Sequence, residues 1–368
     1  MKSRIVQALA GVAVSVLALW LTLRGKDLGD VWEAMRQADY RYLLLYLPFW
    51  AVIHLSRTWR WGILLEPVAK VPFAKLNAVS CVGWMALTIL PFRLGEFARP
   101  YLIAERPKLR VSAALSSVVV ERVSDGLFTA LLLMLCLLGV PSGSPNVHFL
   151  RVAGGIMGGV FLGAFAFLVV AYKSRAVATR LLEKMIGPLS PRVAQRVAGM
   201  MDSFIHGLRI VPSRGKVLLF VALTFVYWGF NGWGMQVLAQ GFGLHLTLFE
   251  SCTLLGVLVI GVMIPAGPGM IGTFHVAILY ALGLFFPATV VHRQGMAYAN
   301  VLWATQLVLQ IGLGLVFLFS RHIRMGQVLA APEEVADELD EEAQQDEAAA
   351  REETAQAAEV RVAPIVNR

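Results

Sequence analysis

The sequence has few charged residues and few cysteines for its length. Asp, Glu, Lys and Arg make up only 15% of its 368 residues, whereas 57% are hydrophobic and the mean hydropathy is +0.67. This composition excludes an ordinary water-soluble domain and predicts a polytopic membrane protein. The three cysteines, Cys81, Cys136 and Cys252, are odd in number, far apart and inside apolar segments. They indicate neither a disulfide framework nor a metal site, and we expect them to be packing residues.

Acidic residues are scarce before residue 333. The segment that starts there holds 12 of the 24 acidic residues, so residues 1–331 carry 29 basic residues against 12 acidic ones. These basic residues flank apolar segments and do not cluster with aromatic residues on a soluble surface. The sequence pI of about 9.6 therefore does not indicate binding to nucleic acid.

Motifs for catalysis are also missing. The sequence has no nucleophile elbow, no pair of His or Cys residues at metal-ligand spacing, and no ATP-binding motif in a soluble segment. We therefore expect no cofactor and no metal, and we favour a transporter over an enzyme. An intramembrane enzyme stays open as an alternative, because its catalytic groups can be few and dispersed.

The apolar segments predict six full membrane spans. A spanning helix needs about 20 mostly apolar residues. Segments of that kind lie at 5–23, 42–65, 112–140, 152–172, 217–239 and 294–320. Residues 24–41 predict a short amphipathic helix at the interface, and residues 174–211 predict amphipathic helices on the cytoplasmic surface.

Two further apolar stretches are too short to span comfortably. If the 15 residues at 77–91 crossed the membrane, the basic segments 93–110 and 173–216 would both lie outside the cell, against the positive-inside rule. A hairpin over 77–105 that enters from the cytoplasm and returns avoids this conflict. The segments 247–264 and 273–286 flank a glycine-rich piece and predict either a second hairpin or two full spans.

These features together predict an all-α membrane protein built as an inverted repeat. The first hairpin opens to the cytoplasm and the second opens outward, an arrangement that in transporters places the substrate at the midplane, where interrupted helices meet. We expect a transmembrane domain over 1–325 in the cell inner membrane, with both termini in the cytoplasm. Residues 326–368 have too little apolar surface to fold alone, so we expect a solvated acidic tail, disordered or partly helical, that can be removed after Gln327.

Charged residues at the end of the first short segment are candidates for a site. Arg93, Glu96 and Arg99 follow one another at i, i+3 spacing, so they share one face if Pro91 starts a helix. Ionisable groups at membrane depth are expensive unless they pair or line a wet cavity. Arginine also offers a planar fork that suits two phosphate oxygens. We expect the two arginines to bind a lipid phosphate and Glu96 to orient them; the alternative is an interfacial salt-bridge ladder.

A second charged group lies inside the span 112–140. Glu121, Arg122 and Asp125 follow a stretch of small and branched residues. Because Arg122 and Asp125 can pair with each other at i, i+3, we expect these three residues to hold Arg93 and Arg99 in place and not to contact the substrate.

The glycine-rich piece supplies the last candidates. Gly267, Gly269 and Gly272 match G-x-G-x-x-G, but the strand, helix and soluble βαβ context of a dinucleotide site is missing. We predict a hairpin tip whose backbone N–H groups could hold an anion. The alternative is a plain helix break with packing glycines. His275, just after the tip, is a candidate for binding a headgroup or proton, although a lone membrane histidine is more often a packing residue.

These motifs carry a family resemblance. Pro-x-Arg-x-Gly-Glu-x-x-Arg over 91–99, Glu-Arg-x-x-Asp over 121–125 and the glycine-rich piece over 265–274 resemble the transmembrane region of lysylphosphatidylglycerol synthases, a family of flippase-like membrane proteins. The resemblance covers about the first 325 residues. No aminoacyl-transfer domain follows the last span here, so we do not expect synthesis of the aminoacyl lipid.

The resemblance, together with the interrupted helices, implies a lipid flippase or transporter. Its substrate would be a phosphate-bearing amphiphile: a phospholipid, an aminoacyl-phospholipid or a polyprenyl-phosphate lipid. The alternative is a membrane enzyme or an accessory subunit of glycolipid or aminoacyl-lipid synthesis, in which case a lipid-synthesis enzyme is a candidate partner.

Overall fold

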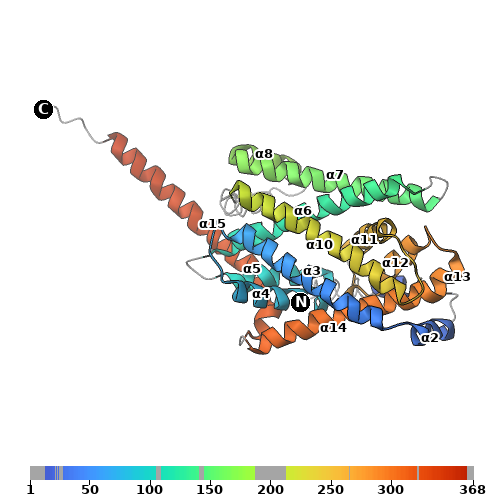
Figure 1. Ribbon diagram of the computed structural model, residues 1–368. Coiled ribbons are helices and arrows are strands. Elements are labelled where there is room, and N and C mark those ends of the chain that lie inside the picture. Colours follow the sequence, from blue (N-terminus) through green and yellow to red (C-terminus); the bar gives the residue numbers. More distant parts are fainter. Residues whose placement is uncertain are drawn as a thin grey trace.

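The computed structural model describes residues 13–20, 22, 24, 28–104, 109–140, 145–186, 213–264, 266–320 and 323–362. These parts of the chain are helical and form no β-strand, which confirms the predicted all-α class (Figure 1). The helices are α2 (Leu28–Gln37), α3 (Arg41–Leu65), α4 (Phe73–Ile89), α5 (Ala98–Ile103), α6 (Val111–Leu138), α7 (Pro145–Lys173), α8 (Arg175–Ile186), α10 (Arg214–Gln240), α11 (Leu248–Met263), α12 (Thr273–Leu282), α13 (Ala288–Val290), α14 (Met296–Ser320) and α15 (Met325–Val362), with short η1 (Pro91–Phe97), η2 (Pro268–Met270) and η3 (Val291–Gly295).

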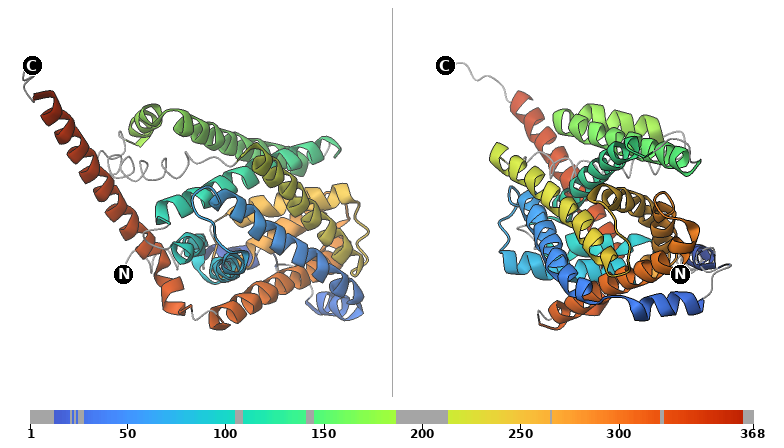
Figure 2. Two further views of the ribbon diagram at one scale, coloured as in Figure 1. Left: turned by 60° about the vertical axis from the view of Figure 1, so that its left-hand side comes forward. Right: turned by 45° about the vertical axis from the view of Figure 1, so that its right-hand side comes forward.

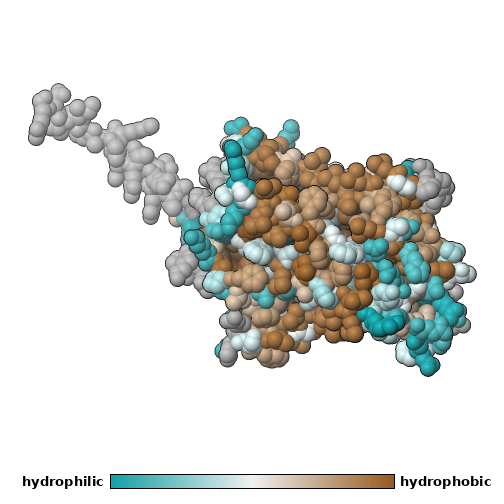
Figure 3. Space-filling model, in the orientation of Figure 1, coloured by the Kyte–Doolittle hydropathy of each residue, from teal (hydrophilic) through white to brown (hydrophobic). Residues whose placement is uncertain are grey.

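Long apolar helices make up the body. Within the described residues, three helical stretches are long and apolar enough to cross a membrane: Val147–Lys173, Arg214–Gln240 and Ala288–Ser320. Helices α3 and α6 match the predicted spans 42–65 and 112–140 closely, but both carry charged residues. The predicted span 5–23 and the cytoplasmic segment 174–211 lie partly outside the described residues. In the space-filling view hydrophobic residues cover the middle of the visible face, and hydrophilic residues gather around α2 (Figure 3).

The helices pack so that the two ends of the body differ. Helix α3 lies along α10, α6 along α7, and α4 along α14. Helices α2 and α13 lie at one end, whereas α5, α8 and the beginning of α15 lie at the opposite end (Figures 1 and 2). The largest buried cluster joins α10, α11, α12 and α14. Of the cysteines that we expected to pack, Cys81 and Cys136 are buried and Cys252 is partly buried.

Both short apolar segments are interrupted helices. Helix α4 ends at Ile89 because Pro91 disfavours a helical residue before it, and Leu90 accordingly has an extended conformation. The chain then folds back on α4 at Gly95, where a Cβ atom would lie 2.1 Å from the backbone nitrogen of Leu87. Helix α11 starts with a capping box formed by Thr247 and Glu250, and η2 and α12 follow its end.

The C-terminal segment differs from the expected solvated tail. Helix α15 covers Met325–Val362, and its first part packs against α4, α5, α6 and η1 before the helix projects away from the body (Figures 1 and 2). Buried residues recur on one face of this part: Val328, Ala331, Val335, Leu339 and Glu342. The expectation fails for 325–342 because these apolar residues have the spacing of an amphipathic helix and find a partner surface in the body.

Candidate functional site

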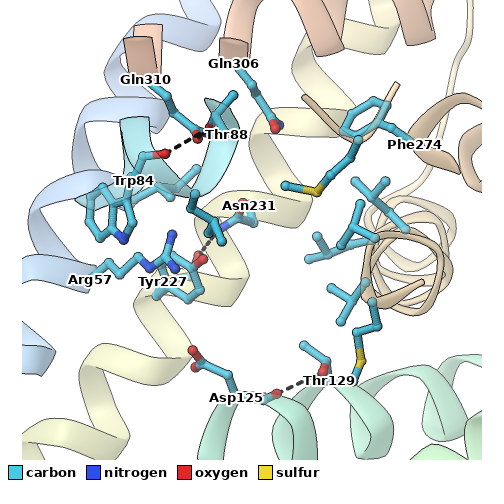
Figure 4. Close-up of a pocket in the computed structure, with 18 of the residues that line it drawn as sticks. Arg57, Trp84, Thr88, Asp125, Thr129, Tyr227, Asn231, Phe274, Gln306 and Gln310 are labelled. Carbon is cyan, nitrogen blue, oxygen red and sulfur yellow. Dashed lines mark hydrogen bonds between the residues drawn. The ribbon is translucent and has the colours of Figure 1, made fainter. Parts of the chain in front are cut away.

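A cavity of about 490 Å³ lies inside the body where the two interrupted helices meet. Its walls come from α3, α4, η1, α6, α7, α10, α11, η2, α12 and α14, and Figure 4 shows part of this lining. The tips η1 and η2 touch each other, and Arg93 Nη1 donates a hydrogen bond of 3.2 Å to the carbonyl oxygen of Val262, near the end of α11. The two breaks in the helices therefore form one site.

Among the residues that the structure describes, eight charged side chains form a connected group beside this cavity, which we call the arginine network. It contains Arg57 and Arg60 from α3, Arg93 and Glu96 from η1, Arg99 from α5, and Glu121, Arg122 and Asp125 from α6. Five arginines against three carboxylates give the network a net charge of +2. Charges at membrane depth need compensation, so an anionic ligand can neutralise this excess of positive charge.

Two ion pairs are fully buried and anchor the network. Arg99 pairs with Glu121, and their side chains are only 2% and 0% exposed. Arg60 Nη2 lies 2.6 Å from Asp125 Oδ1, and the indole nitrogen of Trp228 donates to the same oxygen at 3.3 Å. Each pair joins a helix of the first half of the chain to α6, so the pairs fix α6 relative to α3 and α5.

Weaker pairs connect the anchors to the cavity wall. Arg122 lies 3.1 Å from Glu121 and 3.7 Å from both Glu96 and Asp125. Glu96 also accepts a hydrogen bond of 2.8 Å from Arg93. Arg122 thus interacts with three carboxylates, and Glu96 interacts with two arginines. The charges of these residues are therefore compensated by the group and not by isolated pairs.

Aromatic rings support three of the arginines. The guanidinium carbon of Arg57 lies 4.3 Å from the ring centre of Trp84, that of Arg99 lies 4.4 Å from Trp61, and that of Arg60 lies 4.8 Å from Phe220. Such contacts stabilise a desolvated cation and fix the plane of its fork. These rings therefore help to orient the guanidinium groups of Arg57, Arg60 and Arg99.

The backbone is strained at both tips. Arg93 and Met270 have φ angles of +59° and +52°. Residues other than glycine rarely adopt this left-handed backbone conformation. Residues of this kind cost on the order of 1–3 kcal/mol each and cluster at functional sites. Both line the cavity, so the strain lies at the site and not at its margin.

The structure divides the charged residues that the sequence singled out into two groups. Arg93, Glu96, Arg122 and Asp125 line the cavity. Arg99, which we expected to bind the phosphate, lies behind the wall and pairs with Glu121. Arg122, which we expected to act only as a support, instead reaches the cavity. Relative to the cavity, the two arginines therefore lie in the opposite positions from those expected.

The glycine-rich piece contributes mainly packing. The N–H group of Gly267 donates to Ser15 Oγ at 2.9 Å, and a Cβ atom on Gly272 would lie 2.7 Å from the backbone nitrogen of Leu19. Gly269 lines the cavity, and its carbonyl oxygen accepts a hydrogen bond of 2.7 Å from the indole of Trp303. His275 is buried beside Trp303, with ring centres 5.5 Å apart, and does not line the cavity.

Sequence reasoning missed two arginines and a polar wall. Arg57 and Arg60 have the same i, i+3 spacing as Arg93 and Glu96, but they lie near the end of the predicted span 42–65, where basic residues are common at the cytoplasmic side. Gln306 and Gln310 lie on one face of α14 and line the cavity. Polar amides inside an apolar span were the signal that could have indicated this wall.

Two comparisons place the chain among known proteins. The family model described as the lysylphosphatidylglycerol synthase TM region matches residues 8–314. The chain is similar to a protein of Methanothermobacter thermautotrophicus described as a UPF0104 membrane protein, with 23% identity over 280 residues that cover 71% of this chain and 80% of that relative. The match includes both interrupted helices and the whole arginine network, so this chain belongs to the family of the lysylphosphatidylglycerol synthase transmembrane region.

Proposed function

We propose that this protein moves a phosphate-bearing amphiphile across the membrane. The observation that carries the proposal is the net charge of +2 on the arginine network, next to a cavity at the junction of two interrupted helices. A buried cation without enough carboxylate partners is costly, and a phosphate oxygen accepts charge-assisted hydrogen bonds from arginine. An anionic headgroup would complete the network.

The cavity also has room for an apolar part of the ligand. Leu255, Leu258, Val259 and Val262 form an apolar wall on α11, which the charged group meets where Arg93 contacts the carbonyl oxygen of Val262. One side thus suits a charged headgroup, and the other suits the hydrocarbon next to it. This division favours an amphiphile over a free inorganic anion.

The fold supports an alternating-access mechanism. We propose six spans and two hairpins, α4–η1–α5 and α11–η2–α12, related as an inverted repeat with the substrate at their junction. Hairpin α4–α5 lies toward the end that carries α8 and the beginning of α15, whereas α2 and α13 lie at the other end (Figures 1 and 2). We assign the α8 end to the cytoplasm because its flanking sequence is rich in Lys and Arg, and we place the protein in the cell inner membrane.

Reconstitution tests this proposal. Proteoliposomes containing the full chain and a lipid with a fluorescent acyl chain would be treated with an impermeant quencher, and the lipid would afterwards be recovered and weighed by mass spectrometry. We expect lipid from the inner leaflet to reach the quencher faster than in protein-free vesicles, and its mass to stay unchanged. Vesicles with the Arg57→Gln variant should expose the lipid to the quencher more slowly than those with the unchanged protein. A changed lipid mass would instead favour the enzyme of lipid synthesis, and equal exposure in both kinds of vesicle would refute transport.

A further inference from the structure

The charge of the cavity wall depends on which arginines reach it. Arg57, Arg93 and Arg122 line the cavity, and the acidic residues that line it in the described part of the chain are Glu96 and Asp125. The ion pair of Arg57 with Glu121 is long, at 3.8 Å, and its Nε atom, like Nε and Nη2 of Arg122, is buried without a hydrogen-bond partner. The side chain of Arg57 is 15% exposed and lies over Trp84 at the cavity (Figure 4). The wall is therefore cationic toward any headgroup.

A second wall is polar but uncharged. The Thr88 hydroxyl has one proton for two acceptors, Gln310 Oε1 at 2.7 Å and the carbonyl oxygen of Trp84 at 2.9 Å, and neither contact uses the Nε2 amide of Gln310 as a donor (Figure 4). Asn231 Nδ2 donates to the carbonyl oxygen of Tyr227 at 2.7 Å, which leaves Asn231 Oδ1 as an acceptor. Gln306 lies one turn before Gln310 on the same helix and also lines the cavity. These groups match hydroxyl groups, which both donate and accept.

We infer that the cavity selects lipids whose headgroup is a net anion bearing hydroxyl groups, and that it discriminates against headgroups carrying an added amine. The inference rests on the proposed function and names its substrate class. An amine would add positive charge beside three arginines in a low-dielectric site, where like charges repel strongly. An anionic headgroup without hydroxyl groups would leave these half-buried amides without a partner on the ligand, and polar sites reject a ligand lacking a hydroxyl in this way.

Binding and transport are measured separately so that the two proposals can fail independently. Binding of short-chain phosphatidylglycerol, phosphatidic acid and lysyl-phosphatidylglycerol to the full chain in detergent would be followed by tryptophan fluorescence, because Trp50, Trp84, Trp228 and Trp303 line the cavity. Transport of the same lipids would be followed in proteoliposomes. We expect phosphatidylglycerol to bind about tenfold more tightly than either other lipid, the difference expected for one lost polar contact.

Two substitutions test the uncharged wall. In Gln310→Leu the preference for binding phosphatidylglycerol over phosphatidic acid should fall severalfold. Arg57→Gln should instead weaken the binding of both lipids alike, so the ratio of their affinities should not change. Gln306→Leu provides a second variant because its hydrogen bond to Tyr46 is long, at 3.5 Å. The ratio of the affinities for two lipids, measured in one protein preparation, does not depend on the fraction of the protein that is folded.

The outcomes separate the hypotheses. Equal or tighter binding of lysyl-phosphatidylglycerol overturns the inference, and so does a ratio that is unchanged in both glutamine variants. Transport of all three lipids at one rate, without a binding preference, leaves the proposed transport intact and refutes the selectivity. The expected preference in binding without any transport supports the selectivity and refutes the transporter. Absence of binding and transport for every lipid refutes both.

Discussion

Removing α15 should destabilise the protein, although the composition of this segment indicates a dispensable tail. The side chains of Val328, Val335 and Leu339 are 1%, 1% and 5% exposed. Full burial of such a side chain contributes about 1.5–3 kcal/mol, so the three contribute on the order of 5–9 kcal/mol as an upper estimate. That is comparable with the whole stability of a typical domain, about 5–15 kcal/mol. A chain that ends at Gln327 should therefore unfold at a much lower temperature.

A polar contact adds to this effect. The Glu342 carboxylate accepts hydrogen bonds from the backbone N–H groups of Val111 and Ser112, at 2.9 and 3.3 Å, at the start of α6. A carboxylate at a helix N-terminus contributes about 0.5–2 kcal/mol. Glu342→Gln should therefore lower the midpoint of thermal unfolding slightly, whereas Asp337→Asn, at an exposed position of the same helix, should leave it unchanged.

The assay compares two truncations in one detergent by fluorescence-detected size-exclusion chromatography after heating. The first ends at Gln327, and the second ends at Gln344, so only the second keeps the buried face of α15. We expect the second to match the full chain and the first to aggregate at a lower temperature. Equal midpoints for the two truncations would show that the docked face contributes no stability.

Three other predictions concern the site and the topology. Arg99→Lys should lower the thermal midpoint and leave the lipid preference unchanged, because this arginine is buried in an ion pair behind the cavity; an altered preference at normal stability would contradict this placement. Gly95→Ala should prevent normal folding, since its Cβ would lie 2.1 Å from backbone, whereas Gly159→Ala, with nothing within 4 Å, should be silent; similar yields of folded protein would disprove the close approach. In a background without native cysteines, an impermeant thiol reagent should label Arg36→Cys but not Gln345→Cys in intact cells, and labelling of both would refute the topology.

Local signals in the sequence predicted the helices and their interruptions. The length of each apolar segment determined the helix, and Pro91 and the glycines marked the breaks, because these residues act through the backbone conformation of their neighbours. Arg93 and Glu96 were also found, since ionisable residues in an apolar context are rare enough to indicate a site. Such information lies within a few residues of each feature.

Pairing across the fold could not be predicted in this way. Arg60 reaches Asp125, 65 residues later, and only the packing of α3 against α6 brings them together. The same packing decides that Arg99 lies behind the wall and Arg122 at the cavity. The acidic segment was misjudged for another reason: its composition is that of a solvated tail, but the few apolar residues recur at 328, 331, 335 and 339, which is a helical period. The average composition of the segment concealed this apolar helical face.

The docked helix and the arginine network share structural elements, so their stabilities should be linked. Helix α15 contacts η1, α5 and α6, and these three elements carry six of the eight charged residues of the network. If docking of α15 positions them, α15 increases the affinity for an anionic lipid, and by reciprocity the lipid stabilises the docked state. Phosphatidylglycerol should then raise the thermal midpoint of the full chain more than that of the truncation after Gln327. An equal rise in both would show that α15 stabilises the body without positioning the site.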